Sequence, residues 1–365
     1  MPERVKVLFY APGFLFGGIE SLMIGWCENF DSKRVRFDLL REQREETDAV
    51  KRLKALGGNV YSLPHFRSLP SYFKELTAFF RDHNDYDVLH AQTPNLFVFF
   101  LARMHGIRNI VIHSHTTRYN RYNISSAIKT VLNWNAKKLV TDRLACSHTA
   151  GQWMYGKNKE FTIVNNSIDT VNYLFNSDVR DTTRAALGLS ENLVIGNVSR
   201  FSIPKNHLFL LEIFNEILKI NPKSKLLLVG DGELRPMIEK KIADLGLGDS
   251  VILTGVRDDI PDLLQAMDLF LLPSIFEGFP VTIVEAQASS LPCVLSDAVT
   301  EETRFTDLVS FISLERPAKF WAEQVLERAA KTERTNRYED VVKAGYDMKT
   351  TAKWLEDYYF RLAKK

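Results

Sequence analysis

Short apolar runs alternate along the chain with longer stretches of mixed polarity. Six runs in the first half predict strands, at residues 5–11, 35–40, 60–64, 87–92, 109–115 and 143–147. Six more runs predict a second series, at residues 193–200, 225–230, 250–255, 268–273, 292–296 and 308–314. Stretches with helical character separate the strands nearly throughout, a pattern typical of parallel sheets that helices cover on both faces. We therefore expect an α/β protein.

The two series of strands indicate two domains. The 365 residues exceed what one hydrophobic core usually supports, and a polar, turn-rich stretch at 165–176 lies between the two series. We expect two Rossmann-like, doubly wound domains with a cleft between them. Ligands bind beyond the carboxyl ends of the strands in open parallel sheets, so motifs at those ends are the first candidates for a site. A final helix is predicted at Thr351–Leu362 from apolar residues at helical spacing, and it fits equally well on either domain.

Composition narrows the class of protein. Hydrophobic residues make up 45% and charged residues 25% of the chain, as in an ordinary soluble protein, and a net charge of +2 gives no general reason to bind nucleic acid. Cys27, Cys146 and Cys293 lie far apart in apolar surroundings, which indicates buried thiols in a reducing compartment. The N-terminus enters a strand without a signal peptide, and the longest apolar stretch, Leu96–Ala102, is too short to span a bilayer. We expect a cytoplasmic protein.

The most informative chemistry follows the strand predicted at 268–273. The loop carries Glu277, Gly278 and Pro280, and a helix is expected from about Val281 with Glu285 one turn inside it. The first amides of a helix lack intrahelical partners and lie at the positive end of its dipole, so an anion such as phosphate binds there. Two carboxylates around a phosphate site suit a ligand with hydroxyls on both sides of its phosphates. A nucleotide sugar, with its ribose, diphosphate and hexose, has this layout.

Glu277 and Glu285, with seven residues between them, resemble the paired-glutamate signature of retaining GT-B glycosyltransferases of family 4, also called group 1. Two acidic positions match by chance easily, so the resemblance depends on further motifs. It implies two Rossmann-like domains that face a central cleft, with an acceptor domain at 1–170 and a donor domain at 171–346. A C-terminal helix at 347–365 is then expected to cross back to the acceptor domain.

The resemblance assigns roles around the glutamate loop. It implies that Glu277 faces the hydroxyls of the donor sugar and that Glu285 accepts hydrogen bonds from the ribose. The backbone of the loop and of the first helical turn is expected to hold sugar and phosphate, through Gly278, Phe279, Pro280, Val281 and Thr282.

Two cations lie close together after the strand at 193–200. Arg200 ends that strand and Lys205 follows in the next loop. Both resemble the family's cations that neutralise the donor diphosphate. Breaking the bond between sugar and phosphate leaves negative charge on the diphosphate, and fixed cations aimed at that charge stabilise the transition state.

Two further strand ends resemble nucleotide-binding segments of the family. Gly230 and Gly232 follow the strand at 225–230, and glycines there permit a close approach of the backbone. Val256 and Arg257 follow the next strand, where the family brackets the base. No residue in these segments distinguishes uracil from guanine.

The first domain carries a glycine-rich turn and a histidine pair. Gly17 and Gly18 follow the first strand, with a spacing that differs from G-x-G-x-x-G and so disfavours a nicotinamide cofactor. His113 and His115 lie on one face of the strand at 109–115. By resemblance, the glycines pass close to the diphosphate, His115 reaches the donor sugar near the anomeric carbon, and His113 supports it. A hydrogen-bonded structural histidine is the alternative, and a zinc site lacks a third ligand.

Asp85 and Asp87 match the D-x-D pattern that binds metal in the other large glycosyltransferase fold. Here they precede a strand, which is the wrong end for a site. We interpret them as part of a helix-to-strand turn, and we expect no metal and no cofactor.

Residues 118–143 hold six basic residues and one acidic residue, with aromatic side chains between them. Such a segment suits an anionic membrane surface or a lipid-linked pyrophosphate. A solvated helix face explains it equally well.

Together these features predict a hexosyl or N-acetylhexosaminyl transferase that takes its donor as a nucleoside diphosphate sugar, with a UDP-sugar expected. The resemblance to enzymes of exopolysaccharide, capsule or other cell-surface polysaccharide synthesis implies a saccharide or polyprenyl-linked saccharide acceptor and peripheral contact with the inner face of the plasma membrane. Front-face substitution is the implied mechanism, in which Glu277, His115, Arg200 and Lys205 position and stabilise rather than attack. Two alternatives stay open: a nucleotide-sugar 2-epimerase of the same architecture, and a non-catalytic nucleotide-sugar-binding subunit.

Overall fold

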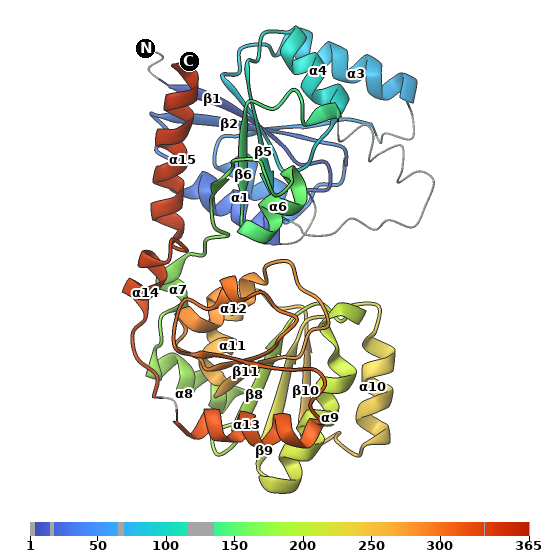
Figure 1. Cartoon of the computed structure of the whole chain (residues 1–365), viewed down its shortest axis with the longest axis vertical. Helices are drawn as coiled ribbons and strands as arrows, with labels where there is room; N and C mark the ends of the chain where they lie inside the picture. The colour runs from blue at the N-terminus through green and yellow to red at the C-terminus, as the bar shows by residue number, and fades with distance from the viewer. Residues whose placement is uncertain (1–3, 15–17, 65–68, 116–134, 332, 365) are drawn as a thin grey trace. The chain divides into compact units, whose positions relative to one another are not determined.

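Two compact units make up the chain in its computed structural model (Figure 1). Unit 1 comprises Met1–Ile168 and Asp347–Lys365, and unit 2 comprises Asp169–Tyr346. The structure describes residues 4–14, 18–64, 69–115, 135–331 and 333–364.

Unit 1 contains, within its described residues, a seven-stranded parallel sheet of order β3-β2-β1-β4-β5-β6-β7. Its strands are β1 (Val5–Tyr10), β2 (Val35–Arg41), β3 (Asn59–Ser62), β4 (Val88–Ala91), β5 (Asn109–Ser114), β6 (Asp142–Ala145) and β7 (Thr162–Ile163). Its helices are α1 (Gly18–Asn29), α2 (Asp48–Ala55), α3 (Leu69–Asp82), α4 (Leu96–Met104), α6 (His148–Tyr155) and α15 (Met348–Ala363).

Unit 2 contains a six-stranded parallel sheet of order β10-β9-β8-β11-β12-β13 in the part of the chain that the structure describes. Its strands are β8 (Leu193–Val198), β9 (Ser224–Val229), β10 (Val251–Gly255), β11 (Leu269–Leu272), β12 (Cys293–Ser296) and β13 (Val309–Ile312). Its α-helices are α7 (Thr170–Tyr173), α8 (Ser177–Ala186), α9 (His207–Ile220), α10 (Arg235–Asp244), α11 (Ile260–Ala266), α12 (Val281–Ala288), α13 (Ala318–Lys331) and α14 (Tyr338–Lys343). Two short 3-10 helices are η1 (Ile203–Lys205) and η2 (Glu301–Thr303).

Each sheet divides its unit into two cores, because successive side chains of a strand point to opposite faces. Val5, Val7 and Phe9 of β1 lie in one core of unit 1 with α1 and α15, whereas Leu8 and Tyr10 lie in the other with α3 and α4. In unit 2, α9, α10 and α13 cover one face of the sheet, and α11 and α12 cover the other. Parallel strands between two layers of helices confirm the predicted α/β class.

The last helix, α15, packs on the first half of the chain. The side chains that it buries in the core of unit 1 include Met348, Ala352, Leu355, Tyr359 and Leu362. Arg34 forms ion pairs with Glu356 at 2.6 Å and with Asp357 at 2.7 Å. The Tyr359 hydroxyl lies 2.6 Å from Nδ1 of the buried His90. A helix that crosses back to the first half, as the resemblance implied, is therefore part of the fold.

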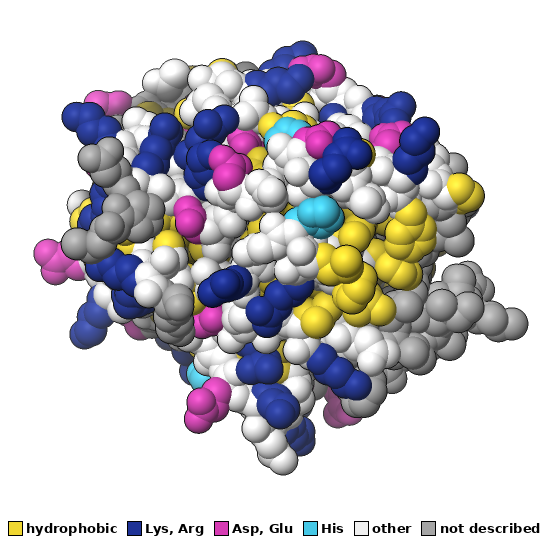
Figure 2. Space-filling model, turned by 90° about the horizontal axis from the view of Figure 1, so that it is seen from above, with side chains coloured by type: hydrophobic (Ala, Val, Ile, Leu, Met, Phe, Trp, Pro, Cys, Tyr) yellow, Lys and Arg dark blue, Asp and Glu magenta, His cyan; other side chains and the backbone are white. Residues whose placement is uncertain are grey.

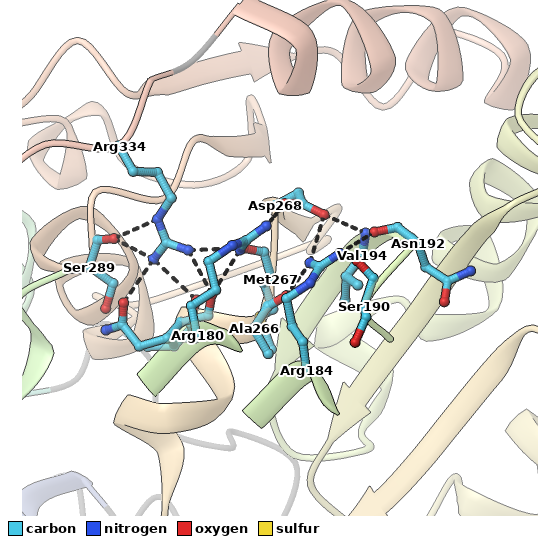
Figure 3. A network of polar contacts seen from close by, with 12 residues as sticks. Arg180, Arg184, Ser190, Asn192, Val194, Ala266, Met267, Asp268, Ser289 and Arg334 are labelled. Atoms are coloured by element: carbon cyan, nitrogen blue, oxygen red, sulfur yellow. Dashed lines mark hydrogen bonds and ion pairs between the residues drawn. The ribbon is translucent and has the colours of Figure 1, made fainter. Parts of the chain in front are cut away.

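In unit 2, Arg334 lies in the chain that follows α13 and binds the C-terminal ends of two helices, α11 and α12. It donates to the carbonyl oxygens of Gln265 at 2.8 Å and Met267 at 3.0 Å, at the end of α11 (Figure 3). It also donates to the carbonyl oxygen of Ser289 at 2.5 Å, at the end of α12. Carbonyl oxygens at a helix C-terminus carry partial negative charge, which favours a cation there.

Arg334 belongs to a group of three arginines around one carboxylate. Arg180 and Arg184 both pair with Asp268, the latter at 3.2 Å, and Asp268 also accepts from the amide of Val194 at 2.8 Å (Figure 3). Burial, together with the nearby charge of Arg180, lowers the pKa of Arg334 to about 9. One aspartate cannot neutralise three arginines. The partial negative charge of the helix carbonyls therefore compensates the charge of Arg334.

We expect Arg334→Met to lower the free energy of unfolding by about 2–4 kcal/mol, because the carbonyl oxygen of Ser289 loses its donor and those of Gln265 and Met267 keep only Arg180. Urea denaturation measures the change. Arg316→Met is the matched control, since Arg316 is exposed and should shift stability by less than about 0.5 kcal/mol. Equal midpoints for the two variants would contradict the role of Arg334.

Candidate active site

The donor-side candidates lie in four loops at one edge of the unit 2 sheet. Strands β8, β9, β10 and β11 are parallel neighbours, so the loops that follow them emerge at the same carboxyl edge. The loop after β8 carries Arg200 and Lys205, and the loop after β11 carries Glu277. The sequence placed these motifs at strand ends, and the parallel order of the strands brings those ends together.

Lys205 and Glu277 form an ion pair across two of these loops. The Lys205 ammonium lies 2.7 and 2.8 Å from the two carboxylate oxygens, and the Ser274 hydroxyl donates to the same carboxylate at 2.7 Å. The Glu277 side chain is 8% exposed and that of Lys205 is 21% exposed. A carboxylate this well buried needs such partners, because losing water without new hydrogen bonds is costly.

Two hydrogen bonds to backbone carbonyl oxygens hold these two loops together. The amide of Ile275 donates to the carbonyl oxygen of Pro204 at 2.8 Å. The side-chain amide of Asn206 donates to the carbonyl oxygen of Pro273 at 3.0 Å. The Lys205 ammonium is therefore fixed beside Glu277 by main-chain geometry as well as by charge.

Arg200 is held much more loosely than Lys205. Its guanidinium contacts one oxygen of Glu233 at 3.1 and 3.2 Å, and these two side chains are 74% and 53% exposed. Exposed ion pairs contribute little free energy, so an anionic ligand can exchange for Glu233 at small cost.

Gly230 and Gly232 make room for the neighbouring loop. A Cβ on Gly230 would lie 2.1 Å from the carbonyl oxygen of Ser199, and one on Gly232 would lie 2.5 Å from that of Phe201. The amide of Phe201 donates to the carbonyl oxygen of Asp231 at 2.9 Å. The sequence explained these glycines by approach to a ligand, whereas in the structure they admit the backbone of the loop that carries Arg200. Their contact with the nucleotide stays a prediction.

The N-terminus of α12 directly follows the Glu277 loop. Its N-cap residue, Pro280, provides no side-chain hydrogen bond to the first turn. Gly278 and Phe279 lead into the helix, and Val281 and Thr282 begin it. The five residues whose backbone is predicted to hold sugar and phosphate thus lie within a few positions of Glu277, at a helix start that suits a phosphate. Their contacts with a ligand stay a prediction.

Glu285 lies in the second turn of α12 and binds the hydroxyl of Tyr173 from α7. Its side chain is half-buried, and burial raises the pKa of the Glu285 carboxyl to about 7. Its protonation therefore changes near neutral pH, unlike that of an ordinary glutamate.

The expected base site is the turn after β10. Val256 is 80% exposed, which leaves its backbone and side chain accessible to a ligand. Arg257 is paired with Asp259, with Nε 2.7 Å from a carboxylate oxygen.

In unit 1, His115 is held between two side-chain amides. Its Nδ1 lies 2.9 Å from the oxygen of Asn166, and its Nε2 lies 2.8 Å from the oxygen of Gln92. Burial lowers the pKa of His115 to about 4, so the ring is neutral near pH 7 and has one N–H. One amide must therefore offer its NH₂ group. The Gln92 nitrogen has no other hydrogen-bond partner among the described residues, so Gln92 is the amide that donates to His115, and the His115 N–H donates to the Asn166 oxygen.

His113 lies in a column of rings behind His115. The centroids of the two imidazoles are 4.1 Å apart, and the Trp26 ring stacks on His113 at 5.6 Å. His113 is fully buried, and its Nε2 lies 3.2 Å from the carbonyl oxygen of Val164. It can support His115 by packing, as the resemblance implied.

The remaining candidates of unit 1 differ in how far the structure describes them. Gly18 begins α1, with open space where a Cβ would lie, and Gly17 lies outside the described residues. Of the basic segment, residues 116–134 also lie outside them. Within the segment's described part, the ammonium of Lys137 donates to the carbonyl oxygen of Met154.

Asp85 and Asp87 both bind Lys6 at the start of β1, Asp87 through the Lys6 amide at 2.8 Å. They tie the turn before β4 to its neighbouring strand. In the part of the chain that the structure covers, no group of three His, Cys, Asp or Glu side chains can hold a metal ion. Likewise, none of the described helices combines the length and apolar character that a bilayer crossing requires.

Comparison with known proteins follows the same division of the chain. Residues 192–320 match the family model for glycosyl transferases group 1, and residues 16–171 match that for glycosyltransferase family 4. A putative glycosyltransferase, EpsF of Bacillus subtilis (strain 168), is 31% identical over an alignment that covers 94% of this chain and 94% of the relative. The chain belongs to this family of glycosyltransferases.

Two further relatives extend the comparison. UDP-Gal:alpha-D-GlcNAc-diphosphoundecaprenol alpha-1,3-galactosyltransferase of Escherichia coli is 30% identical over 66% of this chain and 64% of its own length. The solved structure of Anabaena Alr3699/HepE in complex with UDP and glucose covers 98% of this chain and 100% of that chain, with a TM-score of 0.79 at 20% identity. The predicted GT-B fold class is confirmed.

Sequence reasoning missed the side chains that hold the candidate residues of this glycosyltransferase in place. Ser274 binds Glu277, Tyr173 binds Glu285, and Gln92 binds His115. Gln92 ends a predicted strand, so a search for polar residues at strand ends finds it. Tyr173 falls in the polar, turn-rich stretch between the two series of strands, and no local signal marks it.

We expect Gly232→Ala to lower the free energy of unfolding of this glycosyltransferase by about 1–3 kcal/mol, because the new methyl group collides with backbone. Gly248→Ala is the control, since a Cβ there meets nothing within 4 Å. Thermal unfolding measures both. A Gly232→Ala protein as stable as the Gly248→Ala protein would rule out the tight packing of the two loops.

A second expectation concerns pH. The pKa of Glu285 is raised in the folded state from 4.5 to about 7, so its contribution to stability is present below about pH 4.5 and is lost as the pH rises through about 7. Glu285→Gln should therefore be more stable than wild type by about 1–3 kcal/mol at about pH 8. The difference should shrink toward about pH 5, where wild type regains its proton.

Urea midpoints of the two proteins across this pH range provide the measurement. A difference between Glu285→Gln and wild type that does not vary with pH would show that Glu285 titrates as an ordinary glutamate.

Proposed function

We propose that this protein is a retaining glycosyltransferase that moves a hexosyl or N-acetylhexosaminyl group from a UDP-sugar to a saccharide or polyprenyl-linked saccharide acceptor. The observation that carries the proposal is the Lys205–Glu277 ion pair beside the N-terminus of α12. It puts a cation for the departing diphosphate next to a carboxylate that can accept hydrogen bonds from sugar hydroxyls. Synthesis of exopolysaccharide, capsule or another cell-surface polysaccharide is the expected setting.

The charges of the loops support a front-face substitution. The bond between the anomeric carbon and the diphosphate oxygen breaks, and its electron pair stays on the diphosphate, which Lys205, Arg200 and the first amides of α12 stabilise. The acceptor hydroxyl attacks the same face of the sugar, and its proton passes to the departing diphosphate. Glu277 already accepts from Lys205 and Ser274, so it orients the sugar rather than attacking it.

The choice of substrates rests on the relatives. Alr3699/HepE was solved with UDP and glucose, and the name of the Escherichia coli relative specifies a UDP-galactose donor and a diphosphoundecaprenol-linked acceptor. A polyprenyl-linked acceptor implies work at the inner face of the plasma membrane. The three free cysteines are all buried, which suits a cytoplasmic location.

Because Lys205 and Glu277 neutralise each other, single and double variants separate their roles. Lys205→Met should weaken UDP binding about tenfold or more, since a charged hydrogen bond to phosphate is lost. Glu277→Gln should bind UDP at least as tightly as wild type, because it frees the ammonium, yet transfer should fall about a hundredfold or more. Calorimetry with UDP and transfer assays with a panel of UDP-sugars provide the two readouts.

Two controls accompany these variants. Lys205→Met/Glu277→Gln removes both charges together, so it should fold normally and still bind UDP weakly. Glu239→Gln, on the exposed side of α10, should behave as wild type in both assays. Sugar conversion by wild type with donor alone would indicate an epimerase, and full transfer by Glu277→Gln would remove Glu277 from the site.

A further inference from the structure

The outward side of α4 is apolar. Its inner side is buried in the core of unit 1 through Val98, Phe99 and Ala102. On the other side, Phe97 and Leu101 are half-buried, whereas Phe100 and Met104 are 52% and 65% exposed. A helix that is apolar on all sides normally lies in a protein core or in lipid. At nine residues, α4 is far too short to span a bilayer.

A neighbouring helix extends this apolar surface. The ring of Phe73 on α3 lies edge-on to that of Phe97, with 4.5 Å between their centroids, and Phe73 is itself half-buried. We call Phe73, Phe97, Phe100, Leu101 and Met104 the α3–α4 surface. Figure 2, which views the molecule from the side of unit 1 where α3 and α4 lie, shows apolar side chains gathered in one patch with Lys and Arg side chains beside it.

The charges beside the α3–α4 surface that lack an ion-pair partner among the described residues are positive, because the two acidic residues of α3, Glu75 and Asp82, pair with Arg44 and Arg81. Arg103 on α4, Lys74 on α3 and Arg108 after α4 are exposed, and α4 contains no acidic residue. None of these three cations forms an ion pair with any residue that the structure describes. The outer side of α10 contrasts with this, because Arg235 pairs with Glu239 and Lys240 pairs with Asp244.

The α3–α4 surface starts at the edge of the sheet where the acceptor side is expected. Asn95 caps α4 by accepting from the amide of Phe97 at 3.1 Å, and its side-chain nitrogen donates to the hydroxyls of Tyr10 at 2.8 Å and Tyr72 at 3.0 Å. Gln92, three residues earlier, contacts His115. The apolar helix follows β4 and the candidate histidine follows its parallel neighbour β5, so both begin at the same carboxyl edge of the sheet.

We infer that the α3–α4 surface docks this protein onto an anionic lipid bilayer. Phe100 and Met104 reach into the boundary between headgroups and acyl chains, and the unpaired cations attract anionic headgroups. The biological sense of the inference rests on the proposed function, because a polyprenyl-linked acceptor is presented at a membrane. The docking itself needs no substrate.

A second copy of this chain fits the surface less well than a bilayer does. A two-fold dimer would place the same patch of both copies face to face. Arg103 and Lys74 of one copy would then meet the same cations of the other, since α4 has no acidic residue and those of α3 already pair with Arg44 and Arg81. An anionic bilayer offers both an apolar interior for Phe100 and Met104 and negatively charged headgroups for the cations.

Co-sedimentation with vesicles tests the inference without any sugar substrate. The full-length protein should bind vesicles of phosphatidylcholine mixed with phosphatidylglycerol much better than vesicles of phosphatidylcholine alone, and added salt should weaken the binding. Phe100→Ser/Met104→Ser should weaken it about tenfold or more, since two apolar side chains no longer insert. Lys74→Gln/Arg103→Gln should weaken binding to the anionic vesicles about tenfold.

Ile220→Ser/Met237→Ser is the matched control, because these side chains of unit 2 are 54% and 52% exposed and lie outside the surface. It should bind vesicles as wild type does, and thermal unfolding should show every variant folded. Wild-type binding by Phe100→Ser/Met104→Ser would overturn the inference. So would a wild-type dimer in light scattering that this variant dissociates, because a second copy would then cover the surface.

Failure of the docking inference and failure of the proposed function give different results. If the protein transfers sugar to a water-soluble acceptor while vesicle binding ignores Phe100 and Met104, the docking inference fails alone. If no UDP-sugar is turned over but vesicle binding depends on these two residues, the docking surface stands and the proposed function fails.

Discussion

The ion pair between Lys205 and Glu277 is the interaction on which the donor side of this glycosyltransferase depends. A carboxylate that is 8% exposed persists only with good partners, and Lys205 and Ser274 provide them. The partners come from the ends of two neighbouring parallel strands, so the sheet fixes their distance. The start of α12 follows Glu277 by a few residues along the chain, so a fixed Glu277 also anchors the loop that leads into this helix.

This arrangement suits an anionic ligand, because both cations can bind it without giving up a contact that is costly to lose. The Lys205 ammonium has three donors, and a phosphate oxygen can take one that Glu277 does not use. Arg200 can leave its exposed partner for the diphosphate at little cost. Behind the loops, glycines admit the neighbouring backbone and Arg334 holds the far ends of α11 and α12. The site is therefore supported from both ends of α12.

The sequence predicted the fold class and the neighbourhood of the donor residues because both follow from local patterns. Apolar runs mark buried parallel strands, and parallel strands bring the residues after them to one edge. Lys205 and Glu277, 72 positions apart, could be expected near each other on this ground alone. The same reasoning could not pair Tyr173 with Glu285, because the contact depends on how a short helix outside the sheet packs against α12.

Other features needed the structure for different reasons. The stretch Leu96–Ala102 is apolar throughout, so its sequence does not tell which side faces the core and which faces solvent. The glycines at 230 and 232 suggest close approach, but not whether a ligand or a neighbouring loop approaches. The two amides around His115 come from separate strand ends, and only their positions show that both ring nitrogens are bound.

A crystal structure of the protein with UDP tests the central role of the ion pair most directly. We expect the diphosphate at the first amides of α12, with Lys205 Nζ in hydrogen-bond distance of a phosphate oxygen and Glu277 still bound to Ser274. A diphosphate bound elsewhere, with the Lys205–Glu277 pair unchanged and far from it, would contradict this role.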